Sequence, residues 1–237
     1  ENRRMDILER FLRENGVIEN IKFQDGVTNI LHLASLSGQV EIIKKFCVIN
    51  DALSKDVDDY NQSIEGEGLG KKKIFRSIFV LQDENGRTPL HLAIIHGHVE
   101  VISYFINNPH KGFEVAYNMY DNDFRTPLHW TAAMGLYNFI LVMSNKSTSK
   151  LLRDCEGRIP LHLAVISGNL NCVKALLRKD SKCKKTKKIE YTCGKEDLEA
   201  LDKYNMCPYH YIAFLNDKEV SFKMSTLFMG AENHIKT

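Results

Sequence analysis

The sequence contains no apolar run long enough to cross a membrane and no framework of paired cysteines. A transmembrane helix needs about 18 or more consecutive apolar residues, and the 237-residue chain has no such segment. No secretory signal peptide is visible either. The six cysteines lack the paired spacings of a disulfide framework, and free thiols in a chain of this size indicate a reducing compartment. We therefore expect a cytoplasmic location, or a place on the cytosolic side of a membrane protein.

The sequence also lacks the short motifs that carry catalysis or hold cofactors. It has no glycine-rich phosphate loop between a strand and a helix, no nucleophile elbow and no paired acidic motif. Cys183, Cys193, Cys207 and His210 have the residue types of a zinc site. Their spacings of 10, 14 and 3 residues omit the close cysteine pairs of a zinc knuckle. We expect no enzyme activity, no metal and no cofactor in this chain.

What the sequence does contain is a block of seven residues that recurs along the chain. Its clearest copies read RTPLHLA, RTPLHWT and RIPLHLA, at residues 87–93, 125–131 and 158–164. A glycine follows the histidine of each of these copies after six residues, and weaker copies surround His32 and His210. A motif that recurs about every 33 residues is typical of a stacked helical solenoid.

The block resembles the ankyrin repeat, because several residue types recur together at the fixed offsets of that family. Thr88 and Thr126 precede the proline that opens a helix, where a hydroxyl caps free backbone N–H groups; Ile159 gives up that cap. Apolar residues at helical spacing follow each glycine, which predicts two antiparallel helices per copy. The resemblance implies an all-α helical repeat solenoid of about five repeats plus a leading half repeat, with two long insertions. It also implies that the block histidines hydrogen-bond along the turns between repeats.

The spacings between the block histidines locate the insertions. They are 59, 38, 33 and 48 residues, which exceed a period of 33 by 26, 5, 0 and 15 residues. A solenoid accommodates insertions in the connections between its helices. We expect residues 1–237 to form a single repeat domain, with a partial leading repeat at 1–23, repeats at 24–48, 82–108, 120–147 and 153–178, insertions at 49–81 and 179–201, and a degenerate terminal repeat at 202–229.

The two ends of the array differ from its interior. Residues 5–15 have the pattern of a second helix without a first, which indicates either a segment cut from a longer protein or an N-terminal capping helix. At the other end, Asn216, Asp217 and Lys218 are polar, as suits a terminal cap. Residues 220–229 look helical, and residues 230–237 are expected to fray.

The resemblance implies that the chain binds a protein or peptide as a monomer and catalyses no reaction. In proteins similar to this one, the partner meets the connecting turns and the exposed side of the first helices, which line a concave face. Carried over copy by copy, the candidate partner-binding residues are Leu36, Glu84, Arg87, Ile95, His96, Asp123, Arg125, Trp130, Met134, Glu156, Arg158, Ile166 and Phe214.

Two rows of equivalent positions stand out on that face. The first row is apolar and consists of Leu36, Ile95, Ala133, Ile166 and Phe214. It either receives an extended peptide or amphipathic helix, or packs against the first helices or an adjacent domain. The second row consists of Arg87, Arg125 and Arg158. These arginines either pair with acidic or phosphorylated groups of a partner, or bond their own turns.

The third copy carries unusual aromatic residues. Trp130 is the only tryptophan of the chain. With Tyr120 and Tyr137 it has the composition of an aromatic cage for a cation; the alternative is that it fills the groove between first helices, half-buried. Phe124 stands where neighbouring turns carry glycine, so this turn requires strain or a different conformation.

The net charge of +2 is unevenly spread, because basic residues gather in the second insertion. The lysines that could contact nucleic acid or anionic lipid, as a weak possibility, are Lys179, Lys182, Lys184, Lys185, Lys187 and Lys188. The alternative is a solvated loop that is basic by composition. No aromatic residue interleaves with these lysines before Tyr191, which argues against a base-stacking surface.

A second class of function follows from the same resemblance. Ankyrin-like arrays occur beside palmitoyltransferase, kinase and transferase domains and on the cytosolic side of ion channels. The chain is then the regulatory or substrate-recruiting arm of a larger enzyme or channel, and any catalytic domain lies elsewhere in the parent chain.

Overall fold

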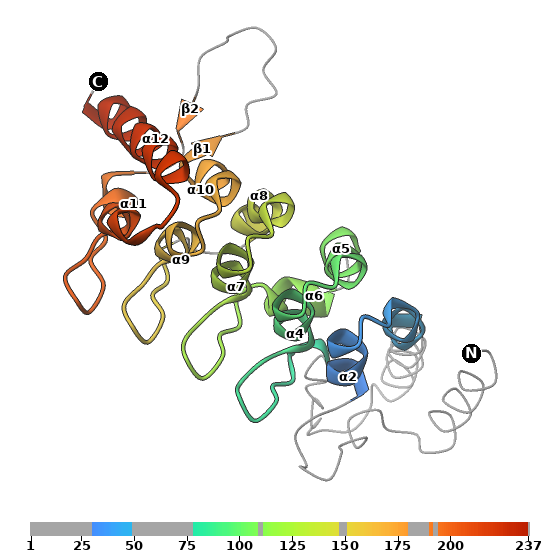
Figure 1. Ribbon diagram of the computed structural model, residues 1–237. Coiled ribbons are helices and arrows are strands. Elements are labelled where there is room, and N and C mark those ends of the chain that lie inside the picture. The colour runs from blue at the N-terminus through green and yellow to red at the C-terminus, as the bar shows by residue number, and fades with distance from the viewer. Residues whose placement is uncertain are drawn as a thin grey trace, which may run out of the picture. The chain divides into compact units, whose positions relative to one another are not determined.

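The computed structural model describes residues 30–48, 78–108, 111–146, 151–179, 190–191 and 194–236. The expected partial leading repeat at 1–23, most of the insertion at 49–81, and Lys182, Lys184, Lys185, Lys187 and Lys188 lie outside these ranges. Within them the chain is largely helical, and the helices follow one another in pairs (Figure 1). None of the described helices is long and apolar enough to cross a membrane.

The chain divides into two compact units, Glu1–Ala116 and Tyr117–Thr237. In the first unit, α2 (Ile30–Leu36) is followed by a helix over residues 40–48, and α4 (Pro89–Ile95) by α5 (Val99–Asn107). Helix α2 packs on α4, as expected for the first helices of successive repeats. The remaining elements of this unit are the short 3-10 helix η2 (Ile78–Val80) and α6 (Lys111–Ala116), which pack together.

An aromatic cluster joins η2, α5 and α6. The Phe113 ring centroid lies 4.7 Å from that of Phe79 and 4.6 Å from that of Phe105, and all three side chains are buried. Phe79 lies inside the range assigned to the first insertion, and Phe113 lies between two predicted repeats. The connections between repeats therefore contribute to the hydrophobic core of this unit, beyond the repeated helices themselves.

The second unit contains three helix pairs in succession. They are α7 (Pro127–Ala133) with α8 (Tyr137–Lys146), α9 (Pro160–Ile166) with α10 (Leu170–Leu177), and the 3-10 helix η3 (Pro208–Phe214) with α12 (Lys218–Lys236). The first helices α7, α9 and η3 pack in sequence, and the second helices α8, α10 and α12 pack in sequence beside them (Figure 1). This is the predicted arrangement of paired helices, in which each pair covers the apolar face of its neighbour.

The second insertion adds elements that the all-α prediction did not contain. Two short strands, β1 (Arg178–Lys179) and β2 (Glu190–Tyr191), pair antiparallel, with Arg178 opposite Tyr191. They are followed by α11 (Lys195–Leu198), which contacts α12. Helices α10 and α12, which precede and follow this insertion, still pack on each other.

The end of the chain also differs from expectation. Residues 230–237 were expected to fray, and this is wrong, because α12 continues to Lys236. Ala231 is fully buried, as are Leu227 and Phe228 one turn earlier. Apolar packing therefore holds the helix beyond Gly230.

Candidate binding surface

A tight turn precedes each of the helices α4, α7, α9 and η3, and an aspartate organises it. We call the turns at residues 83–87, 121–125, 154–158 and 202–206 the finger turns; Figure 1 shows those of the second unit as narrow loops before α7, α9 and η3. In the third of them, Asp154 Oδ1 accepts hydrogen bonds from the backbone N–H groups of Glu156 and Arg158, both at 2.9 Å. Asp83, Asp121 and Asp202 make the same pair of bonds. One carboxylate oxygen thus closes each turn by the side-chain capping typical of aspartate.

The sequence analysis did not identify these aspartates, although the sequence carries a signal for them. Each aspartate lies eight residues before a block histidine, namely His91, His129, His162 or His210. This repeated spacing is visible in the sequence beside the block itself.

Each finger turn bends through a residue with positive φ. At Gly86 and Gly157 φ is +73° and +76°, while Phe124 and Asn205 adopt +58° and +56° at the same position. Of the two alternatives expected for Phe124, the structure has the first: the turn keeps the conformation of its neighbours, in which a bulky side chain is disfavoured. The turn keeps its regular bonding despite that strain: Phe124 N–H donates to Asp121 O at 2.9 Å, as Gly157 N–H does to Asp154 O at 2.8 Å.

The second oxygen of the aspartate binds a different donor in each repeat of the second unit. Asp121 Oδ2 accepts from Trp130 Nε1 at 2.8 Å, and Asp202 Oδ2 accepts from the Tyr211 hydroxyl. Where a leucine follows the histidine, the donor is instead an arginine: Asp154 Oδ2 accepts from Arg158 Nε at 2.9 Å and Nη2 at 2.8 Å.

The titration of these groups follows from their bonding. Burial by itself raises the pKa of Asp154, but the hydrogen bonds from Arg158 outweigh it and hold this pKa below 3.8. Burial raises the pKa of the Tyr211 hydroxyl to about 12, and its bond to Asp202 acts in the same direction. Asp154 is therefore ionised and Tyr211 is neutral over the physiological range.

The block histidines link successive repeats. His129 Nε2 donates to the Arg158 carbonyl at 3.1 Å, and His162 Nε2 donates to the Met206 carbonyl at 3.1 Å. Their Nδ1 atoms accept the backbone N–H of the residue before the block proline. A carbonyl only accepts, so Nε2 carries the hydrogen, and burial lowers the pKa of His129 to about 4. The structural role expected for these histidines is confirmed.

The predicted apolar row lies at the exposed ends of the first helices. In the second unit, Ile166 is 41% and Phe214 71% exposed, and Met134 beside the half-buried Ala133 is 43% exposed. In the first unit, Leu36 and His96 are exposed and Ile95 is half-buried. Each of these side chains is therefore at least partly open to solvent among the described residues.

The predicted arginine row is largely engaged with the protein itself. Arg158 bonds the aspartate of its own finger turn, as one of the two interpretations had it. Arg125 Nε lies 3.5 Å from Asp154 Oδ2 of the following finger turn. Arg87 is half-buried, and its backbone N–H donates to Asp83.

The predicted acidic residues lie at the finger tips. Glu84 and Asp123 are exposed. Glu156 forms an ion pair with Lys203 of the next finger turn, and this pairing lowers the pKa of the Glu156 carboxyl. A partly exposed pair of this kind contributes little to stability. Glu84 and Asp123 are thus the more accessible of the three carboxylates.

Trp130 is half-buried and held by its hydrogen bond to Asp121, as the groove-filling interpretation had it. The Arg125 guanidinium lies over its ring, 5.0 Å from the centroid. Tyr120 stacks on Phe124 at 5.6 Å. The cation that Trp130 meets is therefore the arginine of the finger turn that precedes α7 in the same repeat.

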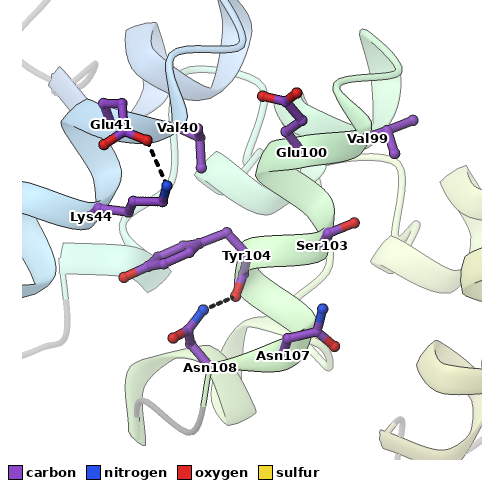
Figure 2. Close-up of a pocket in the computed structure, with 9 residues that line it drawn as sticks. All are labelled: Val40, Glu41, Lys44, Val99, Glu100, Ser103, Tyr104, Asn107 and Asn108. Carbon is purple, nitrogen blue, oxygen red and sulfur yellow. Dashed lines mark hydrogen bonds and ion pairs between the residues drawn. The ribbon is translucent and has the colours of Figure 1, made fainter.

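A groove of about 540 Å³ lies between the second helices of the first unit (Figure 2). It is lined by Val40, Glu41, Lys44, Val99, Glu100, Ser103, Tyr104, Asn107 and Asn108. Lys44 Nζ lies 2.5 Å from Glu41 Oε1, and Asn108 Nδ2 donates to the Tyr104 carbonyl at 2.9 Å. Sequence reasoning did not predict this groove. Of its three charged side chains, Glu41 and Lys44 pair with each other. The described residues hold no cluster of His, Cys, Asp and Glu suited to a metal ion.

A family model described as ankyrin repeats (three copies) matches residues 69–150 and 113–189. Together with the paired helices, this match shows that the chain belongs to the ankyrin repeat family. Ankyrin repeats are generally protein-interaction modules and are typically non-catalytic.

Individual relatives carry the same repeats. Human B-cell lymphoma 3 protein is 30% identical over 95 residues, which are 40% of this chain and 21% of that protein. Inversin from Canis lupus familiaris is 35% identical over 138 residues, 58% of this chain and 11% of inversin. Human transient receptor potential cation channel subfamily A member 1 is 33% identical over 101 residues, 41% of this chain and 9% of the channel protein. The chain thus matches no more than about a fifth of the length of these three relatives.

Proposed function

We propose that this chain is a non-catalytic module that binds a partner protein or peptide with its finger turns and the exposed side of its first helices. The observation that carries the proposal is the apolar row at the C-terminal ends of the first helices, where Ile166 and Phe214 are exposed, together with Met134 next to Ala133 of the row. Apolar side chains repeated at equivalent positions and left open to solvent are typical of an interaction surface. The proposal includes the five repeats and two insertions expected from the block histidines and their spacing, and the leading half repeat expected from the pattern of residues 5–15.

The polar groups beside this row indicate how a partner is recognised. In the second unit, Arg158 and Arg125 are turned toward Asp154, and Glu156 pairs with Lys203. Within these described finger turns, the arginines and Glu156 are thus engaged by groups of the chain itself. We infer that the apolar row supplies most of the affinity, and that the finger tips supply orientation through exposed groups such as Asp123.

The partner that fits such a row is a segment with apolar side chains at regular spacing. An extended peptide or an amphipathic helix presents such side chains along one face. In the first unit, Leu36, Ile95 and His96 occupy the equivalent positions, with Glu84 and Arg87 in the finger turn. We propose that these residues form the corresponding surface of that unit.

The test is a peptide selection against the purified chain. Peptides selected from a random display library are synthesised, and their Kd values are measured by fluorescence anisotropy. The Ile166→Arg and Phe214→Arg variants should each weaken binding by at least about tenfold, because a buried contact is replaced by an unpaired charge.

The matched control is Phe222→Arg. Phe222 is 73% exposed on α12 and is as accessible as Phe214, but it lies on a second helix, away from the finger turns. Circular dichroism confirms the fold of each variant. If the selected peptides bind all three variants as tightly as the parent chain, the apolar row is not the binding site.

A second candidate is a recruiting or regulatory arm of a larger enzyme or channel. It is favoured by the short share of each relative that the chain covers, and by a relative whose name describes a cation channel. The same peptide surface then acts on substrates or subunits of the parent protein. Binding of anionic lipid or nucleic acid through Lys179 and the lysines that follow remains a prediction, for which salt-dependent affinity is the test.

A further inference from the structure

The last described helix pair presents one open face, formed by η3. Three positions of each block face the next repeat: the residue before the histidine, the histidine, and the residue three places after it. Where the next repeat is present within the same unit, these positions are buried, as for Leu31, His32, Ser35, Leu128, His129, Ala132, Leu161, His162 and Val165. In η3 the equivalent residues Tyr209, His210 and Ala213 are all exposed, Tyr209 to 41%.

The hydrogen-bonding groups of a repeat junction are also in place at this face. His210 Nδ1 accepts the Cys207 N–H at 3.0 Å, as the Nδ1 of His162 accepts the Ile159 N–H at 3.2 Å. His210 Nε2 is thereby set as a donor. Whereas His162 Nε2 donates to Met206, no described residue accepts from His210 Nε2.

The finger turn offers the complementary acceptor. Along the second unit each finger turn binds the next through its backbone: Cys155 N–H donates to Asp123 O at 2.8 Å, and Lys203 N–H donates to Glu156 O at 2.9 Å. Tyr204 occupies the position of Asp123 and Glu156 in the last turn, and no described residue donates to its carbonyl. One donor, one acceptor and an apolar surface therefore stand open together.

This composition is unlike that of a capping repeat, whose outer face is polar. The polar residues Asn216, Asp217 and Lys218, which suggested a cap, lie at the end of η3 and the start of α12. The face itself carries an aromatic ring, an imidazole donor and a methyl group.

We propose that this face of η3 is a docking surface for one more ankyrin-type repeat. The first helices already pack in sequence at the α7–α9 and α9–η3 junctions, and the exposed face of η3 has the same groups as one half of such a junction. The occupant supplies a finger turn and a first helix. Its backbone carbonyl accepts from His210 Nε2, its backbone N–H donates to the Tyr204 carbonyl, and its first helix covers Tyr209 and Ala213.

The test supplies such a repeat in a defined form. A second copy of residues 202–236 is joined to the full chain through a flexible glycine–serine linker. This copy carries the Met206 carbonyl and the Lys203 N–H that already serve in the α9–η3 junction. Hydrogen exchange of the backbone amides of the original η3 is measured by NMR with and without the added copy. We expect exchange to slow by at least about tenfold, because a second packed face suppresses local opening.

Ala213→Glu is the discriminating variant. Its side chain is exposed in the parent chain, so the substitution should leave the parent's stability unchanged while abolishing the slowing in the fusion. Tyr209→Lys provides an independent second variant. Asn171→Glu, which adds the same charge at an exposed position of α10, should leave the slowing intact.

Two results would overturn the proposal. One is η3 exchange that does not change on fusion, or that slows equally in the Ala213→Glu fusion. The other is concentration-dependent dimerisation of the unfused chain in sedimentation velocity that Ala213→Glu abolishes, because the face then serves self-association.

Discussion

At the scale of the single residue, the aspartate of each finger turn in the second unit divides its two oxygens between two tasks. Oδ1 is always bound by backbone N–H groups of its own turn, and Oδ2 binds whichever side chain the repeat provides. Trp130 and Tyr211 are explained by this second task, because each follows a block histidine and reaches the aspartate of its own repeat. The turns keep one backbone geometry while their side chains differ.

The histidines predict a specific acid sensitivity. The pKa of His129 is about 4 in the folded chain and 6.5 in the unfolded chain, because burial disfavours the charged ring. Between these values the unfolded state binds more protons, so the free energy of unfolding falls as the pH falls. The contribution of His129 is complete above 6.5, and its loss amounts to at most about 3 kcal/mol as the pH approaches 4. Burial lowers the pKa of His162 as well, so it acts in the same direction.

Urea denaturation at a series of pH values checks this prediction, with His129→Gln as the comparison. The variant should be less stable at neutral pH and should lose part of the slope between pH 6.5 and about 4. Asp154 contributes outside that window, since its pKa lies below 3.8 in the folded state and its stabilisation is lost only at lower pH. A wild-type slope that His129→Gln leaves unchanged would show that other groups cause the acid sensitivity.

At the scale of the element, the finger turns share one backbone conformation although different residues occupy its positive-φ position. Phe124 and Gly157 hold equivalent positions with φ of +58° and +76°, yet only glycine adopts this conformation without strain. A methyl group on Gly157 would also approach the Lys203 backbone nitrogen to 3.1 Å. The two positions should therefore respond to substitution with opposite signs.

We expect Phe124→Gly to raise the free energy of unfolding by roughly 0.5–1 kcal/mol, because it relieves left-handed strain of an exposed residue. Gly157→Ala should lower it by roughly 1–2 kcal/mol. Thermal and urea unfolding of both variants measure the two changes. Equal signs would contradict the view that backbone conformation governs this position, and would point to the stacking of Phe124 on Tyr120 instead.

The sequence predicted the elements that obey the repeat and missed those that do not. The block, the paired helices, the histidine bonds and the strain at Phe124 all follow from local chemistry at fixed offsets. Helix α6 and its contact with Phe79 follow from tertiary packing between segments that share no period. The length of α12 was underestimated for a similar reason, because Gly230 reads as a stop while the burial of Ala231 is visible only in three dimensions.

The binding surface was predictable only in part. The positions of Ile166 and Phe214 follow from counting along the repeat, since equivalent residues share one face. The partners of the arginines do not, because the Asp154 carboxylate is reached from Arg125 of the preceding turn and Arg158 of its own. Such choices depend on distances between repeats, which a single sequence does not specify.

At the scale of the whole molecule, each helix pair depends on its neighbours for burial. In the second unit, α9 lies between α7 and η3, and His162 receives its carbonyl partner from the next repeat. Stability in such an array is approximately a sum of repeat and junction contributions. Removing one repeat should therefore weaken the adjacent one most.

Truncation after Ala200 tests this dependence. It removes the last finger turn, η3 and α12, and exposes Leu161, His162 and Val165 of the preceding repeat. Backbone amides of α9 should exchange at least about tenfold faster, while those of α4 in the first unit should change less. Hydrogen exchange with mass spectrometry resolves the two helices, and equal acceleration in both would contradict nearest-neighbour stabilisation.

The pairing of each finger aspartate also bears on how such a chain can grow. Asp121 and Trp130 are nine residues apart, as are Asp202 and Tyr211, and Asp154 lies four residues from Arg158. Each of these carboxylates therefore has a side-chain partner within its own repeat, although Arg125 also approaches Asp154 from the preceding turn. The histidine that crosses a junction needs only a main-chain carbonyl, which every residue possesses. A gene duplication that copies one repeat also copies the bond between its aspartate and a side chain of the same repeat. The histidine of the copy finds a backbone carbonyl in whichever repeat follows it. The histidine bonds can thus survive the gain, loss or exchange of a repeat without compensating substitutions, whereas the Arg125–Asp154 and Glu156–Lys203 pairs depend on the neighbour's side chain.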